Sequence, residues 1–189
     1  MRNGLQGYSF AFVFLLVAGI GLADEKLAER STLKHQVTGL FSKDRIPDLQ
    51  KTMQKLPDIE LVKIDFDTSE AEFRYDAGKL FPNATPDQIV EQFDNLLRNA
   101  SRHTFGIKPI CKTPREKLML VEIPVVGLDC KACCLAAYEA IYKLEGVERA
   151  TASFKDGLVT AWIDSEKTDR TKLEAALKQR NVTLKDGSQ

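Results

Sequence analysis

Val37-Thr38-Gly39-Leu40 and Val125-Val126-Gly127-Leu128 decide the fold, because the same strand-to-helix junction is found around both. Up to the valine that opens each stretch, most of the alternate positions are hydrophobic, which is typical of a strand with one side in a core. After each stretch, apolar residues recur at spacings of three and four, which predicts an amphipathic helix. The strand positions are Leu33, His35 and Val37, then Met119, Val121, Ile123 and Val125; the helix positions are Ile46, Leu49, Met53 and Leu56, then Ala137, Ala140, Ile141 and Leu144.

Each junction is followed by two strand-like runs and a second helix. Residues 61–66 can pair with 71–75, and 147–154 with 158–163 across an Asp156-Gly157 turn, whose residues tolerate the positive φ of tight hairpins. Thr85-Pro86-Asp87-Gln88 has the cap, first-turn proline and glutamine of a helix start, and Thr168 is the expected cap in the second copy. Short strands near 104–108 and 182–185 close the two copies.

The order is therefore β-α-β-β-α-β twice, an α+β architecture of two tandem ferredoxin-like domains. Each domain is expected to have an antiparallel sheet with two helices on one face. We place the first domain at residues 31–108 and the second at 118–186. The polar segment 109–117 contains Pro109 and Pro114, which break regular structure, so we interpret it as a linker.

The N-terminus predicts export. Arg2 precedes the uncharged apolar run 10–22, which is shorter than a membrane-spanning helix needs, and small residues follow at a cleavage position. We expect a signal peptide at residues 1–23, cleaved after Ala23, and hence a periplasmic or extracellular protein. An uncleaved N-terminal membrane anchor is the alternative.

Charge and cysteine placement narrow the function classes. The chain has 27 Lys and Arg against 27 Asp and Glu, interleaved, which does not favour a nucleic-acid partner. The four cysteines are Cys111 in the linker and Cys130, Cys133 and Cys134 within five residues, so they indicate a site rather than a set of disulfides that staples the fold.

Cys130 and Cys133 are the candidate metal ligands. One is expected in the loop and the other in the first turn of the helix, where a three-residue spacing can place two sulfurs side by side. Unpaired N–H groups and the partial positive charge of a helix N-terminus favour thiolates. Thiolates are soft ligands that suit Cu(I) or another soft ion.

The second copy resembles the heavy-metal-associated domain, through Gly127, Cys130, Cys133, the apolar helix positions and Gly146-Val147. That family includes copper chaperones, the N-terminal modules of copper-transporting ATPases and periplasmic mercury-binding proteins. The resemblance implies that Cys130 and Cys133 bind Cu(I) or Hg(II), and that a membrane metal transporter or another acceptor protein receives the ion. It also makes a metal-bridged homodimer possible.

Several positions depart from the family pattern. Leu128 replaces the usual Met, and Asp129 replaces a Thr or a small residue. The Asp129 carboxylate disfavours thiolates, or could act as an accessory oxygen ligand and favour Zn(II). Cys134 is a possible third ligand, or a small apolar residue of the helix. In the first copy Ser42 and Arg45 stand where the cysteines would be, so that copy is a degenerate one without thiol ligands.

Three functions remain open. The leading hypothesis is a non-enzymatic protein that sequesters or transfers a soft metal. A thiol-disulfide redox protein is the rival, because the Cys-x-x-Cys spacing also serves that chemistry, although the thioredoxin-like strand order and cis-proline are not evident. The third is an interaction module without metal.

Overall fold

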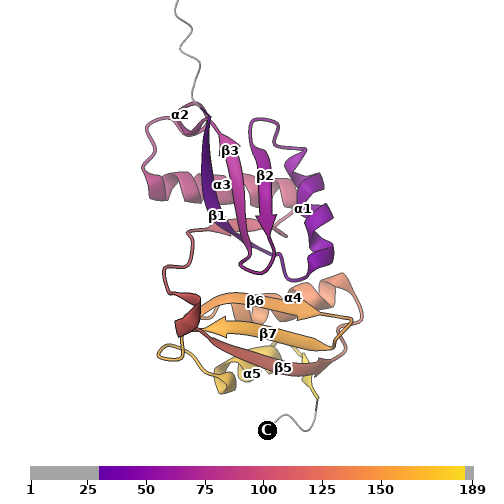
Figure 1. Ribbon diagram of the computed structural model, residues 1–189. Helices are drawn as coiled ribbons and strands as arrows, with labels where there is room; N and C mark the ends of the chain where they lie inside the picture. Colours follow the sequence, from indigo (N-terminus) through magenta and orange to yellow (C-terminus); the bar gives the residue numbers. More distant parts are fainter. Residues whose placement is uncertain (1–29, 186–189) are drawn as a thin grey trace, which may run out of the picture.

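The computed structural model describes residues 30–185, which form two units that follow one another along the chain (Figure 1). The predicted signal peptide lies outside the described residues. In the first unit a four-stranded antiparallel sheet has the order β2-β3-β1-β4. Its elements are β1 (Ser31–Thr38), η1 (Lys43–Arg45), α1 (Ile46–Met53), β2 (Glu60–Asp65), β3 (Glu70–Tyr75), α2 (Ala77–Leu80), α3 (Pro86–Ser101) and β4 (Gly106–Lys108).

The second unit repeats this topology, with the strand order β6-β7-β5-β8 and antiparallel pairing throughout. It begins after η2 (Arg115–Lys117) and contains β5 (Met119–Val126), α4 (Lys131–Tyr142), β6 (Val147–Ser153), β7 (Leu158–Ile163), α5 (Arg170–Gln179) and β8 (Thr183–Leu184). The prediction of two tandem ferredoxin-like domains is confirmed. Both sheets fall inside the ranges predicted for them, although the bounds of the independent folding units stay a prediction.

Local signals set most element ends. Thr85 and Gln88 form the capping box that starts α3, and Gly157 has a φ of 57° in the turn between β6 and β7. The predicted cap of α5 was wrong by one residue. The Asp169 side chain accepts the cap hydrogen bond, whereas Thr168 is buried with 3% exposure. Thr and Asp are both good caps, so sequence alone did not distinguish these neighbours. The short helix α2 was not predicted.

The two units are packed against each other. In β1, residues from His35 to Thr38 are all buried, so the alternation of buried and exposed positions ends there. The Gln36 side chain, on the side away from the core of its own sheet, donates from Nε2 to the Glu148 carbonyl of β6 at 2.8 Å. Phe41, in the loop after β1, is buried in the core cluster of the second unit. The outer face of this sheet, at the end of the inner strand β1, is therefore an interface between units.

The helices of the described part of the chain are all short or polar. None between residues 30 and 185 combines the length and apolar character needed to cross a membrane.

Candidate metal site

The Cys-x-x-Cys segment lies at the N-terminus of α4, as the sequence predicts. Cys130 is the N-cap residue, with extended backbone, and its Sγ accepts a hydrogen bond from the Cys133 N–H at 3.2 Å. The two sulfurs are 2.7 Å apart and are free thiols. Cys130 is exposed and Cys133 is half-buried. The site thus presents two adjacent sulfurs at the protein surface.

Hydrogen bonding makes the two thiols unequal. The contact with the Cys133 thiol, and then the Cys133 N–H, lower the pKa of Cys130, because both stabilise its thiolate. The same thiol contact raises the pKa of Cys133. The charge of Asp129 raises the pKa of both thiols, in the direction expected from the sequence, but it is a minor influence on either. Cys130 is therefore the thiol of the pair that ionises first.

Cys134 is buried, unlike Cys130 and Cys133. It is 3% exposed, belongs to the core of the second unit, and its Sγ lies 3.8 Å from the Leu128 carbonyl oxygen. Burial raises the pKa of the Cys134 thiol. Across residues 30–185, no group of three or more His, Cys, Asp or Glu side chains is placed to hold one metal ion. Among the described residues, the two sulfurs are therefore not part of a larger group of such side chains.

Leu128 performs the packing role expected of it, with 5% exposure in the second core. Gly127 has a φ of 81°, a backbone region that favours glycine, which turns the chain from β5 toward the cysteines. Its counterpart Gly39 has a φ of 82°, and there an added Cβ would also collide with the Thr104 carbonyl. Both copies thus need glycine at the same place in the junction.

The first unit borders the site. A hollow of about 580 Å³ lies between the loop 41–44 of the first unit and the segment containing Asp129 and Cys130, with Phe154 on its wall. Phe154 is 64% exposed. Lys131, which stands between the two cysteines, forms an ion pair with Asp48 of α1 at 3.2 Å. Sequence reasoning missed this neighbourhood because it joins residues more than eighty positions apart.

In the degenerate copy, the positions of the cysteines have other contacts. Ser42 donates a hydrogen bond to Asp44, and Arg45 pairs with Asp48. The Arg45 guanidinium also lies 5.2 Å from the centre of the Phe41 ring and 5.3 Å from that of Phe105. The Arg45 guanidinium and the rings of Phe41 and Phe105 therefore fill this junction. The junction of the first unit offers no thiol.

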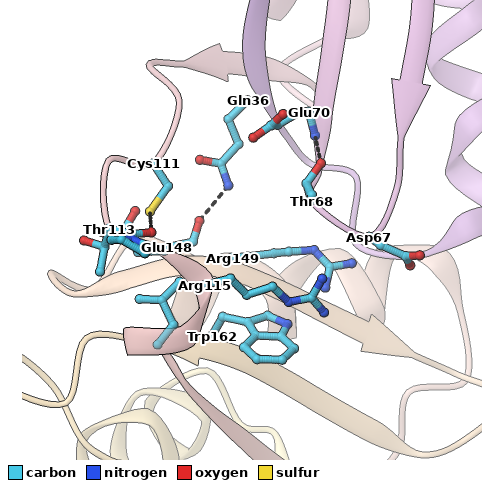
Figure 2. Close-up of a pocket in the computed structure, with 12 residues that line it drawn as sticks. Gln36, Asp67, Thr68, Glu70, Cys111, Thr113, Arg115, Glu148, Arg149 and Trp162 are labelled. Atoms are coloured by element: carbon cyan, nitrogen blue, oxygen red, sulfur yellow. Dashed lines mark hydrogen bonds between the residues drawn. The ribbon is translucent and has the colours of Figure 1, made fainter.

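Cys111 lies in the linker, away from the sulfur pair of Cys130 and Cys133. Its Sγ lies 3.4 Å from the Thr113 carbonyl, to which it donates, and burial raises the pKa of its thiol. It is a free, half-buried thiol on the wall of a second pocket, which Arg115 and Trp162 also line (Figure 2).

Comparison with solved structures finds similarities at low sequence identity and low TM-score. The chain is similar to a CopZ metallochaperone, with 21% identity, a TM-score of 0.35, and coverage of 35% of this chain and all of the other. It is also similar to the N-terminal soluble domains of Bacillus subtilis CopA, with 19% identity, a TM-score of 0.35, and coverage of 86% and 98% of the two chains. No family model and no curated protein sequence matches the chain.

Proposed function

We propose that this protein is an exported, non-enzymatic carrier that binds a soft metal ion as cargo through Cys130 and Cys133. The observation that carries the proposal is the pair of reduced sulfurs, 2.7 Å apart and accessible at the start of α4. A thiolate pair at a helix N-terminus is suited to a thiophilic ion. An accessible pair also allows an acceptor's own thiols to approach the ion and take it over.

The small donor set favours Cu(I) or Hg(II) over Zn(II). Structural zinc is almost always held by four ligands, and catalytic zinc by three protein ligands. Two sulfurs without a third candidate ligand among residues 30–185 offer fewer donors than either kind of zinc site. Cys134 and Asp129 are therefore left out of the proposed ligand set, since the first is buried in the core and the charge of the second disfavours thiolates.

Titration of the reduced protein with Cu(I), prepared without oxygen, tests the proposal. A Cys130→Ser, Cys133→Ser double variant should lose Cu(I) binding and keep its thermal unfolding midpoint. Cys111→Ser is the matched control, because it removes a thiol from the same chain but from another place. If the double variant binds Cu(I) as tightly as the C111S control, the proposal is wrong.

Thiol-disulfide exchange is the second candidate. The unequal pair, with a lowered pKa at exposed Cys130 and a raised one at Cys133, also fits an attacking and a resolving thiol. The antiparallel strand order gives no support to a thioredoxin-like fold. Catalysis of insulin reduction by the metal-free protein, lost in C130S, would favour this function over metal carriage.

The proposal also includes an acceptor for the metal ion and export of the protein from the cytoplasm. The acceptor would be a membrane metal transporter or a soluble protein with its own thiol pair, or a second copy that shares the ion. Export can be tested by N-terminal sequencing of the protein recovered outside the cytoplasm, where a chain beginning at Asp24 is expected. A chain that keeps residues 1–23 would support the anchored alternative.

A further inference from the structure

The lysine between the two cysteines is held by the first unit. Lys131 is the first residue of α4, and its Nζ lies 3.2 Å from Oδ2 of Asp48 on α1, the helix drawn above α4 in Figure 1. Asp48 is the partner of the Lys131 ammonium within residues 30–185, and no hydrogen bond joins that ammonium to either sulfur there. The positive charge that the sequence places beside the sulfur pair is therefore engaged by the other unit.

Asp48 is itself fixed by the first unit. The Arg45 guanidinium pairs with the same Asp48 oxygen, and the Arg45 side chain is only 11% exposed. Arg45 is in turn held against the rings of Phe41 and Phe105. Isolated surface ion pairs contribute little, whereas a network of charges in fixed positions has a more defined effect. Arg45, Asp48 and Lys131 form such a network, and it crosses the boundary between the units.

The residue on the other side of Cys130 is negatively charged. Asp129 is exposed, and its charge acts against the thiolates of both Cys130 and Cys133. With Asp129 before Cys130 and an already paired Lys131 after it, the sulfur pair has little positive charge beside it. This arrangement matters for any loaded site that carries a net negative charge.

The net charge of the loaded site depends on the ion. Two thiolates with one Cu(I) form a complex with a net charge of minus one, whereas two thiolates with one Hg(II) form a neutral complex. A nearby ammonium stabilises the anionic complex by Coulomb attraction and has little effect on the neutral one. Withholding the Lys131 ammonium therefore weakens the binding of a monovalent ion selectively.

We propose that Asp48 is a specificity-determining residue for the sulfur pair. By holding Lys131, it lowers the affinity for a monovalent soft ion and leaves the affinity for a divalent soft ion unchanged. This inference rests on the proposed metal function and concerns which ion the same site prefers. It gives the first unit a role at the site that needs no thiol of its own.

The test compares Cu(I) and Hg(II) affinities of the reduced, full chain, measured by competition with chelators at about 10 mM salt, where charges are screened least. Asp48→Ala should bind Cu(I) about threefold more tightly, the size expected of an exposed pair, and Hg(II) equally well. In the Lys131→Met background, D48A should leave the Cu(I) affinity unchanged, because the ammonium that it releases is gone. At about 1 M salt the gain should disappear.

Asp58→Ala is the matched control. It removes the same charge from the same unit, but Asp58 pairs with Lys79 of α2, at the far end of the first unit from α4 (Figure 1). Neither affinity should change in D58A. Thermal unfolding checks that D48A is folded.

A second measurement needs no metal. In the Cys111→Ser background, the thiols react with the anionic reagent dithiobis(nitrobenzoate) and with neutral dithiodipyridine, and the ratio of the two rates cancels the thiolate fraction. D48A should raise this ratio about threefold, because the released ammonium of Lys131 attracts the anionic reagent. In K131M the same substitution should not change the ratio.

Three results would overturn the inference: equal changes in Cu(I) and Hg(II) affinity in D48A, a gain for Cu(I) that persists in K131M, or a rate ratio that D48A does not alter. Its failure is distinct from failure of the proposed function. If the wild-type protein binds both ions through Cys130 and Cys133 and D48A changes neither affinity, metal carriage stands and the role of Asp48 is refuted. If the wild-type protein binds neither ion, metal carriage itself is refuted, and the specificity inference with it.

Discussion

Phe41→Ala tests whether the two units are one cooperative structure. Phe41 belongs to the loop after β1 but is 2% exposed in the core of the second unit, with its ring centre 6.1 Å from that of Tyr138. Truncating a buried Phe to Ala typically costs about 3–5 kcal/mol. A domain's whole free energy of unfolding is about 5–15 kcal/mol, so this loss is a large share.

Phe154→Ala is the matched control, because Phe154 is 64% exposed and the same atoms are removed. Exposed substitutions usually change stability by about 0.5 kcal/mol or less. Urea unfolding followed by circular dichroism gives both free energies. The Gly39 N–H donates to Tyr138 Oη at 3.0 Å across the interface, so its hydrogen exchange should quicken in F41A and not in F154A. If F41A is no more destabilised than F154A, Phe41 does not hold the units together.

Three further predictions concern single groups. Tyr138→Phe leaves the buried Gly39 N–H without its acceptor, so urea unfolding should show a loss of about 1–3 kcal/mol. Asp129→Asn removes a negative charge that raises the pKa of Cys130, so the pH at which iodoacetamide alkylates this thiol at half its maximal rate should fall; an unchanged midpoint would mean that Asp129 does not act on Cys130. Asp169→Ala removes the cap of α5 and should lower the unfolding free energy by about 1 kcal/mol, whereas a loss below about 0.3 kcal/mol would assign the cap elsewhere.

The features predicted well are those set by residues near one another in the sequence. The capping box of Thr85 and Gln88 involves residues three positions apart, and the Asp156-Gly157 turn depends on a local backbone conformation. The same holds for Cys130 and Cys133, whose closeness follows from one turn at a helix start. Local geometry of this kind is readable from spacing.

The features that were missed depend on how the units pack. The burial of Gln36 and the insertion of Phe41 into the second core both require contacts made more than ninety positions away. Nothing in the alternation of β1 distinguishes a strand end that faces water from one that faces another unit. The pocket at the junction, with Arg115 over Trp162, was unpredictable for the same reason.

The degenerate copy gains a physical explanation from these contacts. At the junction where the second unit has exposed sulfurs, the first unit has Arg45, which stacks on Phe41 and pairs with Asp48. Asp48 in turn holds Lys131, between the two cysteines. Burial is the largest single influence on Asp48 and raises its pKa, but the hydrogen bonds and charges of Lys131 and Arg45 together outweigh it and lower that pKa, so the carboxylate stays ionised. In the first unit the loop that holds thiols in the second has become a surface that docks beside them. A thiol at position 42 or 45 would remove the contacts that Ser42 or Arg45 makes and that hold this loop in position. The first copy could therefore have a metal site only if its attachment to the second were weakened.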